Sequence, residues 1–123
     1  MPVEQATPLR GEIWFVKIPV DPPDKGLRPV VIVSTNERNR HPRANTVLVA
    51  PLSTSIHKQA PTHVLLTPGE TGLNEASVVR AEDLTTVRKE SLQRPRTRLR
   101  QLSNARIFEV ARKVLIAMDC ALP

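Results

Sequence analysis

The chain has 123 residues, a net charge of +6 and a single cysteine, Cys120. This length fits one domain with a modest core, and one cysteine excludes an intrachain disulfide and a cysteine-based zinc cluster. No apolar run approaches the roughly 20 residues of a membrane-spanning helix, and no signal-peptide segment opens the chain, so we expect a soluble, cytoplasmic protein without a membrane partner. The positive charge favours an anionic partner: nucleic acid, an acidic protein or an anionic surface.

Short strands dominate the predicted structure. Residues 1–9 are polar with two prolines and are expected to be disordered, whereas residues 10–123 are expected to form a single domain. Segments rich in β-branched and aromatic residues predict strands. In chain order these strands are 11–18, 29–34, 45–50, 63–66, 77–81 and 84–87. We expect residues 36–43 to form a loop or a single helical turn, and residues 68–70 to form a turn.

The last predicted element is a helix. Ser103 is a good N-cap residue, flanked by Leu102 and Ile107 in the positions of a hydrophobic staple. Apolar residues then recur at helical spacing and form one face. They are Ile107, Val110, Ala111, Val114, Leu115 and Met118. We expect this face to pack across the sheet or to support a dimer. Many short strands followed by one helix indicate a small, mainly β barrel.

A phosphate site is predicted where two strands begin and end. Arg28 lies between Gly26, which permits a sharp turn, and Pro29, which biases the arginine towards extended geometry. A hydroxyl cluster at 53–55 follows the strand 45–50. A guanidinium fork and a hydroxyl that meet at the open end of a small sheet can bind a phosphate. This pairing points to RNA.

Other polar residues are weaker candidates. The three histidines lie in different segments at no ligand spacing, so we expect no metal site and no cofactor. His63 is expected to be structural, whereas His57 follows the hydroxyl cluster and can approach a bound phosphate. Of the two aromatic residues Trp14 and Phe15, strand alternation places one in the core and one outside. Arginines that can stack on bases or contact phosphates stand at 38, 40, 43, 80 and 88.

Arginines also alternate at positions 94, 96, 98 and 100. In an extended strand, residues two apart share a face, so these four side chains would form a stripe. Such a stripe is either a solvated strand edge that discourages aggregation or a surface that contacts RNA phosphates or an acidic partner.

An ordered series of short motifs carries a family resemblance. The motifs lie at 10–14, 27–34, 49–54, 61–64, 72–73, 77–79 and 84–92. In this order they resemble the MazF/PemK family of toxins from bacterial toxin–antitoxin systems. The resemblance implies a small SH3-like barrel of the CcdB/MazF type with a C-terminal helix, usually a homodimer. It also implies a cognate antitoxin whose acidic tail occupies the RNA groove.

The resemblance further implies a metal-independent endoribonuclease that cuts single-stranded RNA at short sequence motifs. The 2′-hydroxyl would attack the adjacent phosphate and leave a 2′,3′-cyclic phosphate and a 5′-hydroxyl. The family's catalytic arginine and hydroxyl fall on Arg28 and Ser53, with Thr54 as the alternative hydroxyl. Either Arg28 itself or His57 would assist proton transfer. The residues expected to bind substrate are Lys25, His57, Arg80 and Arg88.

The chain departs from the common family pattern in two places. It has serine at 53 where many members have threonine, and its loop at 21–26 is shorter and stiffer. Two other functions stay open. The chain can be an inactive member that only binds RNA or antitoxin. It can also be a gyrase-binding poison of the same fold, although such a protein would carry a tryptophan at the end of the last helix, and residues 118–123 contain no aromatic residue.

Overall fold

The computed structural model describes residues 7–57, 59–95 and 99–120. The strands are β1 (Ile13–Lys17), β2 (Leu27–Ile32), β3 (Thr46–Ser53), β4 (His63–Leu66), β5 (Ser77–Arg80) and β6 (Thr85–Arg88). The α-helices are α1 (Asn36–Arg40), α2 (Pro68–Thr71) and α3 (Asn104–Ala117). Short 3₁₀ turns form at η1 (Pro23–Lys25), η2 (Ala81–Asp83) and η3 (Lys89–Ser91).

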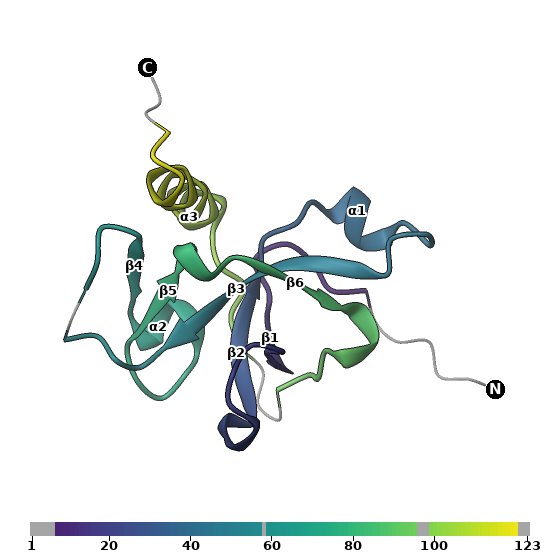
Figure 1. Ribbon diagram of the computed structural model, residues 1–123, viewed down its shortest axis with the longest axis horizontal. Coiled ribbons are helices and arrows are strands. Elements are labelled where there is room, and N and C mark those ends of the chain that lie inside the picture. The colour runs from purple at the N-terminus through teal and green to yellow at the C-terminus, as the bar shows by residue number, and fades with distance from the viewer. Residues whose placement is uncertain (1–6, 58, 96–98, 121–123) are drawn as a thin grey trace.

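All strand pairs are antiparallel, and β3 is the centre of the fold (Figure 1). The strand order is β1-β2-β3-β5-β4, and β6 pairs with the first half of β3. Phe15 of β1 exchanges two backbone hydrogen bonds with Gln93, at 2.9 and 2.7 Å, so the chain after β6 returns to β1. Through this bridge, the sheet formed by β1, β2, β3 and β6 closes towards a barrel. The expected mainly β, barrel-like fold with a C-terminal helix is confirmed.

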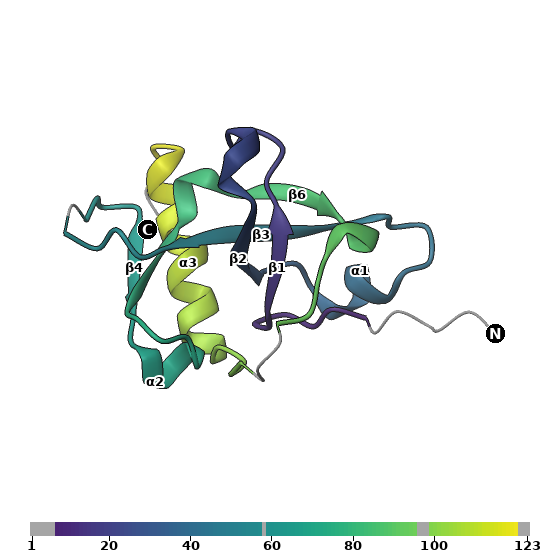
Figure 2. The ribbon, with the colours of Figure 1, turned by 90° about the horizontal axis from the view of Figure 1, so that it is seen from below.

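Two apolar cores lie on opposite faces of the strands. One core is enclosed by β1, β2, β3 and β6 and includes Trp14, Val30 and Val49. The other includes Val31 and Leu52 from the opposite strand faces, and α3 covers it with Ile107 and Val110. Figure 2 shows α3 running alongside the β4 end of the sheet. Both cores contain side chains of β3, so this strand is buried on both faces. Packing on both sides therefore sets the position of its C-terminal end.

The start of α3 forms as the sequence predicts. The Ser103 hydroxyl accepts a hydrogen bond from the Arg106 amide at 3.3 Å, and Leu102 and Ile107 belong to the same core. The predicted apolar face is buried only in its first half. Ala111 and Met118 are exposed. The sheet of one chain therefore covers only part of the predicted face.

Two predicted boundaries also differ. We expect the third strand to end at residue 50, yet β3 continues to Ser53 through the buried Pro51. Pro51 lies between the residues of β3 that pair with β6 and those that pair with β5, and a strand tolerates a missing N–H donor at such a junction. The turn expected at 68–70 is the short helix α2, because Thr67 and Glu70 form a capping box around Pro68.

The N-terminal segment contacts the domain before Arg10. Pro8 is buried, and the Leu9 amide donates to the Glu12 carboxylate at 2.6 Å. Residues 1–6, part of the segment expected to be disordered, lie outside the described residues, as do residues 96–98 of the predicted arginine stripe. Within the described residues, no helix has the length and apolar character needed to cross a membrane.

Candidate RNA-binding and catalytic site

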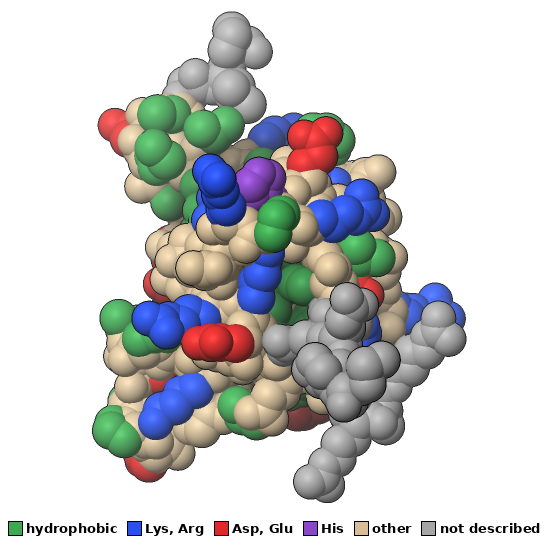
Figure 3. All heavy atoms as spheres, turned by 90° about the vertical axis from the view of Figure 1, so that its right-hand side faces the viewer, with side chains coloured by type: hydrophobic (Ala, Val, Ile, Leu, Met, Phe, Trp, Pro, Cys, Tyr) green, Lys and Arg blue, Asp and Glu red, His purple; other side chains and the backbone are tan. Residues whose placement is uncertain are grey.

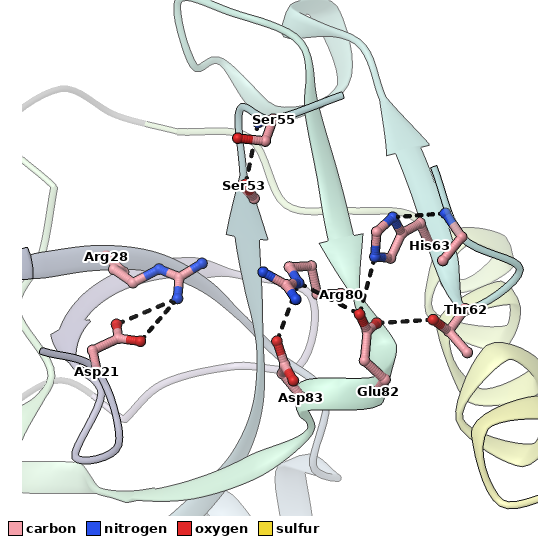
Figure 4. Close-up of polar contacts among 10 residues, drawn as sticks. Asp21, Arg28, Ser53, Ser55, Thr62, His63, Arg80, Glu82 and Asp83 are labelled. Carbon is pink, nitrogen blue, oxygen red and sulfur yellow. Dashed lines mark hydrogen bonds and ion pairs between the residues drawn. The ribbon is translucent and has the colours of Figure 1, made fainter. Parts of the chain in front are cut away.

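The strand register brings Arg28 and Ser53 to the same place. β2 and β3 pair Val30 with Pro51. Extending this register by two residues sets Arg28, near the start of β2, opposite Ser53, the last residue of β3. Residues two apart on a strand share a face, so both side chains project from the same face as Val30 and Pro51. Figure 4 shows Arg28 reaching from β2 towards β3, with Ser53 at the end of that strand.

The β1–β2 loop holds the Arg28 guanidinium. Gly26 turns the chain with φ 70° and ψ −151°, a conformation that side chains disfavour, as the sequence predicts. Asp21 in the same loop accepts from Nη1 of Arg28, at 3.2 Å to Oδ1 and 3.3 Å to Oδ2. The two side chains are only 11% and 13% exposed. Among the described residues Asp21 is the only hydrogen-bond partner of this guanidinium, so its remaining N–H groups are available to a phosphate.

The Ser53 hydroxyl is held by its own turn. Its oxygen accepts a hydrogen bond from the Ser55 amide at 3.1 Å. This contact occupies a lone pair and leaves the hydroxyl hydrogen to donate elsewhere. Thr54, the alternative hydroxyl, follows the end of β3 and is exposed.

A hollow of about 330 Å³ lies at this end of the sheet. Arg28, Ser53 and Thr54 line it, together with Lys25 of the loop. Other lining residues are Phe15, Pro29, Leu52, Ser55, Leu73, Asn74, Glu75 and Ser77. The structure therefore brings together three predicted catalytic candidates and one predicted substrate-binding residue. Such a hollow combines positive charge, hydroxyl donors and an aromatic ring, which suits a nucleotide.

Arg80 lies on the same sheet face as the hollow. β3 and β5 pair Ser53 with Val78, and Arg80 follows two residues later on the same face. Its guanidinium is held by carboxylates, at 3.4 Å from Glu82 and 3.1 Å from Asp83 (Figure 4). Arg80 is thus near the site but already neutralised.

Glu82 is the centre of this network. It also accepts from the Thr62 hydroxyl at 2.9 Å and contacts His63 Nε2 at 3.0 Å. Burial alone would raise the pKa of Glu82. Hydrogen bonds from its own backbone amide, His63 and Thr62 outweigh burial and lower that pKa below its ordinary value. His63 Nδ1 accepts from the Ala60 amide at 3.1 Å, so this histidine connects β4 with Glu82 and with the preceding loop.

Two predicted substrate-binding residues lie away from the hollow. His57 is exposed and does not line it. Arg88 pairs with Thr46, at the opposite end of β3 from Ser53. At a rise of about 3.3 Å per residue, these ends are roughly 23 Å apart. The structure does not bring Arg88 to the nucleotide-sized hollow.

Sequence reasoning missed two acidic residues and left one aromatic residue undecided. Asp21 is the ion-pair partner of Arg28, and Glu75 is the carboxylate that lines the hollow. Both lie in loops without a motif, so only the loop geometry reveals them. Trp14 is the core residue at 2% exposure, whereas Phe15 lines the hollow. In the part of the chain that the structure describes, no three His, Cys, Asp or Glu side chains cluster as metal ligands.

Comparisons with known proteins show the family of the chain. The family model "PemK-like, MazF-like toxin of type II toxin-antitoxin system" matches residues 9–118. The chain is 30% identical over 112 residues to "Endoribonuclease MazF" of Staphylococcus saprophyticus, covering 89% of each chain. It is 32% identical over 104 residues to the protein of the same name from Staphylococcus epidermidis, covering 82% of each.

A solved structure has the same fold. It is the "Endoribonuclease in complex with its cognate antitoxin from Mycobacterial species", with a TM-score of 0.68 and 25% identity. The match covers 97% of this chain and 100% of that one. The family model spans nearly the whole chain, and both staphylococcal relatives are at least 30% identical over more than two thirds of it. The chain therefore belongs to the PemK-like, MazF-like toxins of type II toxin–antitoxin systems.

Proposed function

We propose that this toxin is an endoribonuclease that cuts single-stranded RNA in the cytoplasm, without a metal, at the hollow between β2 and β3. The observation that carries the proposal is that Arg28 and Ser53, from the neighbouring strands β2 and β3, line one hollow of nucleotide size. The names of the two staphylococcal relatives support the same activity. We propose a single catalytic domain from residue 10 to residue 123.

The chemistry needs no nucleophile from the protein. The 2′-oxygen attacks the adjacent phosphorus, the bond to the 5′-oxygen breaks, and the products are a 2′,3′-cyclic phosphate and a 5′-hydroxyl. The free N–H groups of Arg28 stabilise the charge that develops on the phosphoryl oxygens. The Ser53 hydroxyl donates to the same phosphate. Lys25 adds positive charge at the rim of the hollow.

Proton transfer requires a different group. Arginine holds its protons too strongly to act as a base at neutral pH, and His57 does not line the hollow. Glu75 lines it and is a carboxylate, so we assign to Glu75 the proton lost by the 2′-hydroxyl. The 5′-oxygen takes its proton from solvent. The inactive binding module stays as the second candidate function, because Asp21 already occupies one edge of Arg28.

Replacement of Arg28 tests the proposal. Arg28→Ala should abolish cleavage of a defined single-stranded RNA in EDTA, because the phosphate loses its main cation. Arg28→Lys keeps the charge but not the planar fork, so we expect partial activity at most. Cut ends are mapped for a 2′,3′-cyclic phosphate. Arg112→Ala on α3 is the matched control, and circular dichroism checks the fold. If the wild-type protein cuts no RNA in a diverse pool, the inactive binding module is the function that remains.

Replacement of Glu75 tests its assigned role. Glu75→Gln keeps the shape but cannot accept a proton, so kcat should fall by about 10²- to 10⁴-fold. KM should change little, since binding of the phosphate depends on Arg28 and Ser53. Glu75→Asp should recover part of the rate. A glutamine variant with wild-type kcat would assign proton transfer to another group.

We also propose two protein partners. A cognate antitoxin with an acidic tail suits the net charge of +6, and the solved antitoxin complex of the same fold supports it. A second copy of the chain is the other partner. Phe108 and Met118 of α3 are each 65% exposed, which is unusual for large apolar side chains that share one helix.

A further inference from the structure

A strongly basic surface lies at the end of the barrel opposite the hollow. We call it the distal basic surface. It consists of Arg38 and Arg40 of α1, Arg43 of the following loop, and Arg88 and Lys89 at the junction of β6 and η3. Figure 3 shows the side of the molecule that carries α1, with Lys and Arg side chains spread over it and Asp or Glu side chains among them.

The positive charges of this surface are only partly neutralised: Arg88 pairs with Glu90 at 3.3 Å, and two of the other arginines have no carboxylate partner among the described residues. Arg28, Arg80 and Arg106 each pair with carboxylates in their own surroundings. By contrast, Arg40 and Arg43 form no ion pair with any residue that the structure describes, and both are exposed. Segments 36–46 and 88–90 together hold five Lys or Arg and only two Glu. This imbalance is half of the net charge of the whole chain.

The surface also has a defined shape. A hollow of about 580 Å³ lies between the α1–β3 loop and the end of β6. Its lining includes Asn45, Thr46 and Arg88, which offer amide, hydroxyl and guanidinium groups, and one carboxylate, Glu90, which is paired with Arg88. The Thr46 hydroxyl accepts from Arg38 Nη2 at 2.9 Å, and the Lys89 ammonium donates to the His41 carbonyl at 3.1 Å. These contacts join α1, β3 and η3 into one surface.

The character of the surface favours a polynucleotide over a protein. Protein interfaces usually centre on large apolar or aromatic anchors. The exposed large apolar residues of the described chain all lie elsewhere: Val20, Leu27, Leu65, Phe108, Ile116 and Met118. Guanidinium groups beside amides and hydroxyls are instead the groups that bind phosphates and sugars.

We infer that the distal basic surface binds the sugar-phosphate backbone of a long single-stranded RNA whose cleaved bond lies in the hollow at Arg28. The inference rests on the proposed endoribonuclease function. β3 carries Ser53 at one end and Thr46 at the other, roughly 23 Å apart by the rise of a strand, so a short oligonucleotide in the first hollow does not reach the second. The distal surface therefore distinguishes long RNA from short fragments, and it adds affinity without reading sequence.

A charge-neutralised variant tests this inference. Arg40→Gln/Arg43→Gln is made alone and in the Arg28→Ala background, where RNA binds uncut. Binding of a long single-stranded RNA is measured against NaCl concentration. For single strands, each phosphate contact contributes about 0.7 to the slope of log affinity against log salt. Loss of two contacts should therefore make this slope shallower by about 1.4. Arg112→Gln/Lys113→Gln on α3 is the charge-matched control, and its slope should equal that of the wild type.

The active double variant supplies a second readout. Its kcat/KM ratio between a long transcript and a short oligonucleotide should fall relative to wild type. Equal salt slopes for the two double variants, or an unchanged ratio, would overturn the inference. A loss of binding to polyglutamate but not to RNA would assign the surface to an acidic protein instead. Failure of the proposed function gives a different result: Arg28→Ala would then cleave RNA at the wild-type rate.

Discussion

At the scale of single residues, Ser53 and Thr54 compete for one catalytic role. Ser53 is the last residue of β3, and the Ser55 amide fixes its oxygen at 3.1 Å. Thr54 is exposed. We expect Ser53→Ala to lower kcat by about 10²-fold, the cost of one donor to a transition-state oxyanion, and Thr54→Ala to have a much smaller effect. Single-turnover cleavage of one RNA measures both. The reverse order of effects would move the role to Thr54.

The partners of Arg28 illustrate what could be predicted at this scale. The sequence indicates the arginine, because Gly26 and Pro29 constrain its backbone. It does not indicate Asp21, since an aspartate in a proline-rich loop has the same sequence signal whether it faces solvent or an arginine. Likewise Glu75 carries no signal until α2 and β5 place its loop beside β3. Long-range contacts between loops decide such pairs.

At the scale of elements, Glu70 connects α2 with α3. One carboxylate oxygen accepts from the Thr67 amide at 2.9 Å, and the other accepts from Arg106 Nε at 2.7 Å. These two bonds, the Arg106 one first, lower the pKa of Glu70. Glu70→Ala should therefore destabilise the protein by about 1 kcal/mol in urea unfolding at neutral pH, and Glu70→Gln by less. Glu90→Ala, at an exposed pair with Arg88, is the control and should cost almost nothing.

The comparison of wild type with Glu70→Ala also gives a pH dependence with a definite sign. A carboxylate whose pKa is lowered by folding stabilises the native state above its unfolded pKa. That stabilisation disappears as the pH falls through the lowered, folded pKa of Glu70. The difference in unfolding free energy between the two proteins should shrink in acid. A difference that stayed constant with pH would show that Glu70 acts only by packing.

Most elements could be predicted because their signals are local. The Ser103 cap and the strand at 63–66 depend on neighbours within a few residues, and both agree with the structure. The end of β3 could not be predicted in this way. From the sequence, Pro51 predicts the end of a strand. In the structure it lies between the residues of β3 that pair with β6 and those that pair with β5, where no N–H donor is needed. The exchange of partners along β3 is a property of the sheet.

At the scale of the whole molecule, the sequence indicates a polyanion partner but not where it binds. The net charge of +6 is evident from composition. Its division between the hollow at Arg28 and the distal basic surface depends on the fold, because α1 and the end of β6 are far apart in the chain yet meet at one end of β3. The exposed half of α3 likewise depends on where the sheet ends.

The exposed apolar stripe of α3 leads to a prediction for the assembly. Phe108, Leu115 and Met118 are spaced to share one side of the helix, and the body of the chain leaves Phe108 and Met118 65% exposed. If this stripe pairs two copies, Phe108→Glu/Met118→Glu should convert a dimer to a monomer in sedimentation velocity, because charges would be buried without partners. Val20→Glu, at a site 91% exposed and far from α3 in sequence, should leave the dimer intact. If the wild-type protein sediments as a monomer at all concentrations, the stripe would instead be assigned to antitoxin binding. Each toxin chain would then cleave RNA in its own hollow without a second copy.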